Sequence, residues 1–279
     1  MNLCQTLWAS YNALKQAHSD AEMFLVEGKN LSLADYKNAL EKLLNAKEDY
    51  NKSFYTTLPD GREIFTLDYL SIIRLCDVNE VDLNEILAKQ KNNFLYDRRV
   101  NCLSLSGTKV LDLTHLKGLT KLKGLSCSET YVSDLTPLAE ITNLQRLYCY
   151  NTEVSDLAPL ERLTKLEVLD FDMTEVSDLT PLSGLTKLKR LDCSETQVSD
   201  LTPLGGLINL ESHDCSFTNV SNLTSLARLT KLQTLFCIST KVSDLTPLAE
   251  LTKLTIVDAE NNKLNTKSKK LAQQKGWKI

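Results

Sequence analysis

Eight cysteines and three histidines are the side chains of this 279-residue chain best suited to metal binding or nucleophilic catalysis. Five of the cysteines share one position of a repeated sequence unit: Cys127, Cys149, Cys193, Cys215 and Cys237. No CxxC pair or converging histidine accompanies them, so a metal site built from this column is the weaker interpretation. We expect small buried side chains with free thiols, which suits a reducing compartment.

The histidines do not form a catalytic constellation with any nucleophile. His18 lies on an apolar helical stripe, His115 lies in the return of the first, irregular unit, and His213 replaces a leucine. We interpret His213 as a core histidine bonded to the backbone, with a pH-sensitive weak point as the alternative. Phosphate-binding glycine motifs are also absent from the sequence. The sequence therefore predicts a protein without catalysis and without a cofactor, unless residues 1–96 contain unrecognised chemistry.

The elements that position these residues come from a 22-residue unit, which repeats about eight times between residues 97 and 270. With Leu119 as position 1, the unit runs LTKLKGLSCSETYVSDLTPLAE to Glu140. Apolar positions 7 and 9 alternate as in a short strand, and the VSDLTPL segment favours a compact return. One unit cannot bury its apolar face alone, so the units must stack. Neighbouring strands about 4.8 Å apart also keep the cysteines too distant for disulfides.

This unit resembles the LxxLxLxxN pattern of leucine-rich repeats, and its length and DLTPL return resemble the internalin-like bacterial branch. The resemblance implies an α/β solenoid, a right-handed array with short parallel strands on its concave face. Position 12 departs from the family pattern, because threonine replaces asparagine in seven units and Asn262 appears only in the last. We expect the threonine hydroxyls to satisfy buried backbone groups. The regular Asp at position 16 and Lys at position 3 suggest turn capping and a solvated edge.

Three segments follow from this pattern. Residues 1–96 are expected to form an α-helical N-terminal capping domain, with a turn at 58–61 and capping boxes at Ser32 and Asp82. Residues 97–265 form the repeat solenoid. Residues 266–279 form a C-terminal capping helix that ends at Gly276, with Trp277 packing back. Because the first segment is longer than capping requires, self-association or partner docking through its helices is an alternative role.

Composition limits the partners. The net charge is −4 and the pI is near 5.5, which disfavours nucleic-acid binding. The terminal lysines are expected to lie on a solvated helix: Lys263, Lys267, Lys269, Lys270, Lys275 and Lys278. No apolar stretch is long enough for a membrane span, and the first residues do not resemble a signal peptide. We therefore expect a cytoplasmic, bacterial protein, with a host-delivered effector as an open alternative.

The variable residues of the concave face, at positions 5, 6, 8, 10 and 11, are the predicted binding site. These columns contain ten acidic and four basic residues. Along the array a tyrosine pair is followed by an acidic stripe and then by an apolar group: Tyr148, Tyr150, Asp170, Asp172, Asp192, Asp214, Phe217, Phe236 and Ile238. Repeated like charges and exposed aromatic side chains are unfavourable without a partner.

The sequence therefore predicts a protein–protein interaction module that binds a protein or peptide with a basic centre and apolar flanks. The alternative is an inert scaffold face on which the sequence has drifted. A further alternative is an adaptor or effector in which the N-terminal helical domain carries the activity and the repeats select the partner.

Overall fold

The computed structural model describes residues 55–57, 63–65, 75–76, 78–81 and 102–279. The chain divides into two compact units, residues 1–69 and 70–279. In the first unit, β1 (Tyr55–Thr57) and β2 (Glu63–Phe65) pair antiparallel, with Thr56 opposite Ile64. The sequence analysis expected only helices here, although β-branched and aromatic residues favour strands. The helices predicted before residue 55 and over 82–96 lie outside the described residues, as does the turn at 58–61.

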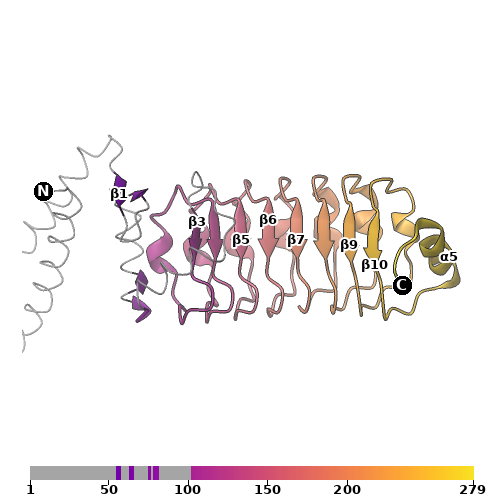
Figure 1. The fold of residues 1–279 in the computed structure, drawn as a ribbon, viewed down its shortest axis with the longest axis horizontal. Coiled ribbons are helices and arrows are strands. Elements are labelled where there is room, and N and C mark those ends of the chain that lie inside the picture. The colour runs from indigo at the N-terminus through magenta and orange to yellow at the C-terminus, as the bar shows by residue number, and fades with distance from the viewer. Residues whose placement is uncertain (1–54, 58–62, 66–74, 77, 82–101) are drawn as a thin grey trace, which may run out of the picture. The chain divides into compact units, whose positions relative to one another are not determined.

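The repeats form one eight-stranded parallel sheet, in which each strand pairs with the strand of the next unit (Figure 1). Each strand contains only positions 6 to 8 of its unit. The strands are β3 (Cys102–Ser104), β4 (Gly124–Ser126), β5 (Arg146–Tyr148), β6 (Val168–Asp170), β7 (Arg190–Asp192), β8 (Ser212–Asp214), β9 (Thr234–Phe236) and β10 (Ile256–Asp258). Because equal positions pair without a slip, residues of one sequence column become neighbours in space. The predicted solenoid of short parallel strands is confirmed.

A short 3-10 helix forms each return, and a proline in its first turn opens five of the seven described. These helices are η2 (Thr114–Leu116), η3 (Thr136–Leu138), η4 (Ala158–Leu160), η5 (Thr180–Leu182), η6 (Thr202–Gly206), η7 (Thr224–Arg228) and η8 (Thr246–Leu248). The position 16 side chain accepts a hydrogen bond from the backbone two residues later, as from Thr136 N to Asp134 Oδ1 at 2.7 Å. The predicted capping role is confirmed, and Asn222 performs it in η7.

Single columns of the repeat fill the core between the sheet and the returns. The leucines at positions 4, 7 and 17 and the valines at position 14 are almost completely buried, as are the position 9 cysteines and Phe171. The five cysteines of the position 9 column are free thiols, as predicted. Burial raises the pKa of the Cys127 thiol to about 12, which keeps it protonated and unreactive.

Position 12 threonines satisfy a carbonyl that the sheet leaves unpaired. The hydroxyl of Thr152 donates to Cys149 O at 2.7 Å, and six other units repeat the contact from position 12 to position 9. The predicted role is confirmed, and each threonine bond stays within its own unit. Only Asn262 reaches the preceding unit, where it donates to Cys237 O at 2.8 Å.

Non-repeating residues close the two ends of the solenoid. At the first end, the buried Asn79 side chain accepts from the backbone of Leu111 and Asp112, both at 2.8 Å, and donates to Asp112 O and Leu75 O. At the other end lies α5 (Thr266–Lys275), which Asn265 caps through Ser268 N. This helix confirms the predicted one.

After α5 the chain turns back onto the sheet. Gly276 has φ +69°, a left-handed conformation that ends the helix, and Trp277 is buried, as predicted. Lys278 then forms a parallel bridge with Asp258, donating its N–H to Val257 O and accepting from Ala259 N. The tail therefore satisfies part of the backbone edge that β10 would otherwise expose.

Candidate protein-binding face

The predicted binding residues lie together on the side of the sheet that faces away from the core, here called the sheet face. It is formed by positions 5, 6, 8, 10 and 11 of the units. Within β5, Arg146 and Tyr148 are partly exposed, whereas Leu147 between them and Cys149 after them are buried. This alternation follows from the two-residue period of a strand.

Position 8 forms a continuous row across five adjacent strands. In the sheet register, Tyr148 pairs with Asp170, Asp170 with Asp192, Asp192 with Asp214, and Asp214 with Phe236. Paired residues of neighbouring strands lie about 5 Å apart. Three consecutive carboxylates, called here the acidic row, therefore lie between two aromatic side chains, in the order that the sequence predicts.

The acidic row is electrostatically unfavourable. Burial, together with repulsion from Asp192 and Asp172, raises the pKa of Asp170 to about 7. Burial is also the main cause that raises the pKa of Asp172 and of Asp214. Among the described residues, none of these carboxylates has an ion pair with a lysine or arginine. Their bonds are local, such as Ser216 N to Asp214 Oδ1 at 2.8 Å.

The tyrosine pair flanks the acidic row on the N-terminal side. Tyr148 and Tyr150 are both partly buried. The hydroxyl of Tyr150 donates to Glu129 Oε1 at 3.0 Å, and burial with this bond raises the pKa of Tyr150 to about 12. Tyr150 therefore presents a neutral ring that an acidic neighbour holds in place.

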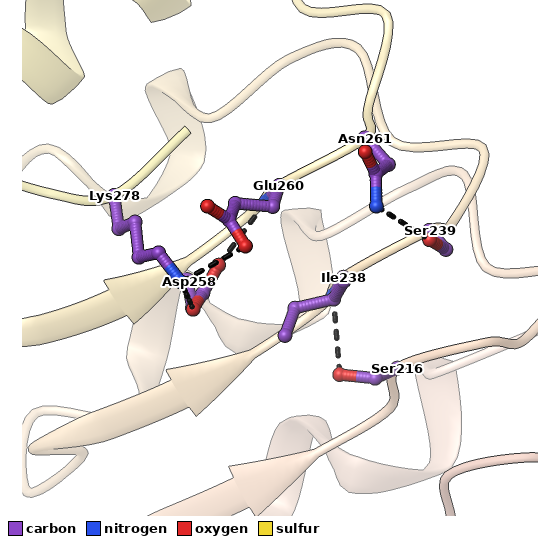
Figure 2. A network of polar contacts seen from close by, with 7 residues as sticks. All are labelled: Ser216, Ile238, Ser239, Asp258, Glu260, Asn261 and Lys278. Atoms are coloured by element: carbon purple, nitrogen blue, oxygen red, sulfur yellow. Dashed lines mark hydrogen bonds and ion pairs between the residues drawn. The ribbon is translucent and has the colours of Figure 1, made fainter.

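An apolar group flanks the acidic row on the C-terminal side. Phe236 and Ile238 are positions 8 and 10 of one unit, and Phe217 N donates to Ile238 O at 2.8 Å. The Phe217 side chain is 55% exposed. Ser216 accepts the Ile238 N–H at 3.1 Å, which fixes the backbone of this group (Figure 2).

Position 11 carries a backbone constraint that the sequence analysis missed. In every described unit this residue has a positive φ, between 50° and 63°, although only the first unit has glycine there. A left-handed conformation costs a residue with a side chain about 1 kcal/mol or more. Phe217 and Met173 accept this cost while remaining exposed, and Met173 directly follows Asp172. Met173 thus belongs to the same surface, and its place in a variable column was the available signal.

The last unit shows a compensated version of the acidic pair. Lys278 Nζ lies 3.0 Å from Asp258 Oδ2 and 2.9 Å from Glu260 Oε2, which are positions 8 and 10 of that unit (Figure 2). Lys278 is exposed, as expected for the terminal lysines, but it lies after α5 and not on a solvated helix, and its ammonium group forms two ion pairs. The chain reversal at Gly276 returns Lys278 to the sheet, which no repeat spacing could reveal.

His213 is on β8, but its side chain is buried in the core and does not belong to the sheet face. Its side chain is completely buried, and Nδ1 lies 3.2 Å from Leu191 O. Burial lowers the pKa of His213 to about 4, so the ring is neutral at pH 7. This agrees with the core interpretation, in which Nδ1 donates to the carbonyl. Nε2 is buried without a hydrogen-bond partner.

The described residues contain no group of three or more His, Cys, Asp or Glu side chains arranged to hold a metal ion. Within the same residues, no helix is long and apolar enough to cross a membrane.

Comparisons with known proteins agree with this geometry. A family model described as leucine-rich repeats in two copies matches residues 142–184. The crystal structure of internalin C2 from Listeria monocytogenes is 34% identical, with a TM-score of 0.56, covering 57% of this chain and 70% of that one. An internalin from the same organism, inlF, is 25% identical, with a TM-score of 0.54, covering 70% and 66% respectively.

A leucine-rich-repeat protein of Leptospira interrogans shares the fold at 16% identity and a TM-score of 0.56, covering 63% of this chain and 52% of that one. No curated protein sequence matches. The stacked strand-and-return units define a leucine-rich-repeat solenoid, a class of protein-interaction modules. Within that class, the chain belongs to the internalin-like leucine-rich-repeat proteins.

Proposed function

We propose that this protein is a non-catalytic binding module whose sheet face recognises a protein or peptide with a basic centre and apolar flanks. The observation that carries the proposal is the acidic row, Asp170, Asp192 and Asp214, placed in register between Tyr148 and Phe236. Carboxylates with raised pKa values destabilise the fold at neutral pH. A basic ligand would remove that cost.

The flanks supply the apolar part of the recognition. Aromatic side chains at the edge of a charged patch are frequent energetic anchors in protein interfaces. Met173 and Phe217 are exposed and have a left-handed backbone conformation. They are position 11 of the units before and after the unit of Asp192, and they add to this apolar surface. The acidic centre would mainly accelerate association, and the aromatic anchors would slow dissociation.

The free thiols support a reducing, cytoplasmic location as part of the same proposal. The five cysteines of the position 9 column, Cys127, Cys149, Cys193, Cys215 and Cys237, are buried and form no disulfides. Thiol labelling of the unfolded protein after purification from its native host tests this location. Quantitative labelling of all cysteines supports it, and blocked cysteines contradict it.

Site-directed photo-cross-linking tests the binding face. A photoreactive phenylalanine analogue replaces Tyr150 in one protein and the exposed Lys187, outside the variable columns, in a control. The proposal expects a partner that cross-links only from position 150. The affinity of the purified partner is then measured by titration for two double variants. One carries Asp170→Lys and Asp192→Lys, and the other carries Tyr148→Ala and Phe236→Ala.

Both double variants should weaken binding at least tenfold. The matched control is Asp134→Lys with Asp156→Lys, which makes the same change of charge at exposed position 16. Because position 16 caps the returns, circular dichroism must first show that the control is folded. Unchanged affinity of the partner for both sheet-face variants contradicts the proposed function.

A further inference from the structure

The tail of the chain shows how this face binds a cation. Lys278 is not part of any repeat, yet its ammonium group contacts carboxylates at both position 8 and position 10 of the last unit (Figure 2). One Nζ thus satisfies two carboxylates from different residues, at 3.0 Å and 2.9 Å. The acidic pair at positions 8 and 10 is therefore a geometry that one ammonium group can bridge.

The same arrangement recurs four units earlier, at β5 and β6. In the last two units an apolar pair at positions 8 and 10, Phe236 and Ile238, precedes the acidic pair Asp258 and Glu260. At β5 and β6 an aromatic pair, Tyr148 and Tyr150, precedes Asp170 and Asp172. Among the described units, no third one has acidic residues at both position 8 and position 10.

The two acidic pairs differ in what lies beyond them. Lys278 lies beside β10, where a following unit would place its position 8, and it pairs with Asp258. Next to β6 the following position 8 is occupied by Asp192, which adds a third carboxylate where the last unit has an ammonium group. Arg190 on the same strand is exposed and makes no ion pair with the described residues, so it does not replace the cation.

We propose that Asp170 and Asp172, beside Tyr148 and Tyr150, form a subsite for the ε-ammonium group of a lysine side chain of the partner. This inference rests on the proposed function and specifies the basic centre of the ligand. The ammonium group bridges positions 8 and 10 as Lys278 does. The alkyl chain of the lysine lies against the tyrosine rings, which favour both methylene groups and a nearby cation.

Lysine fits this subsite better than arginine for a geometric reason. A guanidinium group presents a planar fork that matches the two oxygens of one carboxylate. An ammonium group is a compact charge with three donors, suited to carboxylates from separate residues. Asp172 is one methylene shorter than Glu260, and the adjacent Asp192 offers the ammonium group a third acceptor.

Carboxyl 13C NMR of the full chain tests the subsite with n-butylammonium chloride, which is the lysine side chain as a free ion. Sodium chloride at equal ionic strength and n-butanol are the blanks. We expect saturable shifts at Asp170 and Asp172 and an affinity at least tenfold weaker after Asp170→Asn with Asp172→Asn. Asp134→Asn with Asp156→Asn is the control and should leave the affinity unchanged.

The Lys278→Ala variant tests whether the second acidic pair, Asp258 and Glu260, gains the ability to bind n-butylammonium. This variant removes the ammonium group from Asp258 and Glu260, so n-butylammonium should shift these two carboxyl carbons only in the variant. Circular dichroism establishes that the variant is folded. Because the test depends on new shifts at named atoms, a general loss of stability cannot imitate it.

Several results overturn the subsite. They are shifts at Asp170 no larger than at the exposed Asp134, equal binding of n-butylguanidinium, or a folded Lys278→Ala variant with no new shifts. If these occur while partner binding still depends on Asp170 and Tyr148, the lysine subsite is wrong and the binding face stands. If the partner ignores the whole face, the proposed function fails independently of the NMR result.

Discussion

Replacing Asp170 with asparagine should stabilise this protein at neutral pH. Asparagine keeps the size of the side chain and the oxygen that accepts from Asp172 N at 3.4 Å, but it carries no charge. The pKa of Asp170 is raised from 3.8 to about 7 by burial and by repulsion from Asp192 and Asp172. The ionised carboxylate is therefore less stable in the folded chain than in the unfolded one.

The size of the effect follows from the shift in pKa. A difference of about three units, at about 1.4 kcal/mol each, sets an upper limit of about 4 kcal/mol. The side chain is partly exposed and shares its repulsion with two neighbours, so solvent screening reduces the expected gain to about 1–2 kcal/mol. A polar-to-polar exchange on a strand would otherwise change stability by less than about 0.5 kcal/mol.

The pH dependence separates charge from packing. Because the folded pKa is above the unfolded value, the folded wild type takes up a proton first as pH falls from about 7 towards 4. Wild type therefore recovers stability over this range and the advantage of Asp170→Asn shrinks. Urea unfolding followed by circular dichroism at pH 7.5, 6 and 5 measures both. Asp134→Asn is the control, because Asn222 serves naturally at the same repeat position.

A variant that is destabilised at pH 7.5, or whose advantage does not change with pH, refutes the electrostatic reasoning. The first result would mean that the Asp170 carboxylate makes a favourable interaction that asparagine cannot replace. The second would mean that the gain comes from packing. Either result also removes the main energetic support for a basic ligand.

Three further changes test other parts of the structure. His213→Leu should raise the free energy of unfolding at pH 7 by about 1–3 kcal/mol, measured by urea unfolding, because Nε2 is buried without a partner. Burial lowers the His213 pKa from 6.5 to about 4, so wild type loses stability as pH falls between these values, and the advantage of the variant grows by up to about 3 kcal/mol. Asn79→Ala should lower the free energy of unfolding by about 2–4 kcal/mol and accelerate amide hydrogen exchange at Leu111 and Asp112 more than in the central repeats. Unchanged exchange at these two amides contradicts the capping role of Asn79. Met173→Gly should raise the free energy of unfolding by up to about 1 kcal/mol, because glycine relieves the strain of the positive φ; a lower free energy of unfolding contradicts the strain.

The repeat made most of the fold predictable, because stacking converts sequence position into spatial position. Once Leu147 and Cys149 are assigned to the core, the unit length places Tyr148 beside Asp170 and Asp170 beside Asp192. A slip by one residue would expose the leucine column and bury the aspartates, so burial enforces the register. The order of the tyrosine pair, the acidic row and the apolar group could therefore be predicted before the coordinates were known.

Features outside the repeat could not be predicted in this way. Lys278 reaches Asp258 only because α5 ends in a left-handed residue and reverses the chain. Asn79 lies 32 residues before Leu111, and its capping bonds depend on how the first unit is closed. The strand pair β1 and β2 is equally non-periodic. The left-handed backbone at position 11 is periodic but was hidden, because residue types such as methionine and phenylalanine normally disfavour it.

At two places in the solenoid, an aromatic or apolar pair at positions 8 and 10 of one unit is followed by an acidic pair at the same positions of the next unit. These two places link stability to recognition. In the last unit the chain supplies its own lysine, and that carboxylate pair is compensated at the edge of the sheet. At β6 the described chain supplies none, and the raised pKa of Asp170 records the cost. A fold selected for stability alone would place a lysine or a neutral residue at position 8 of β7, where Asp192 stands. The sequence instead adds a third carboxylate there, which increases the cost and also increases the attraction for a cation from outside.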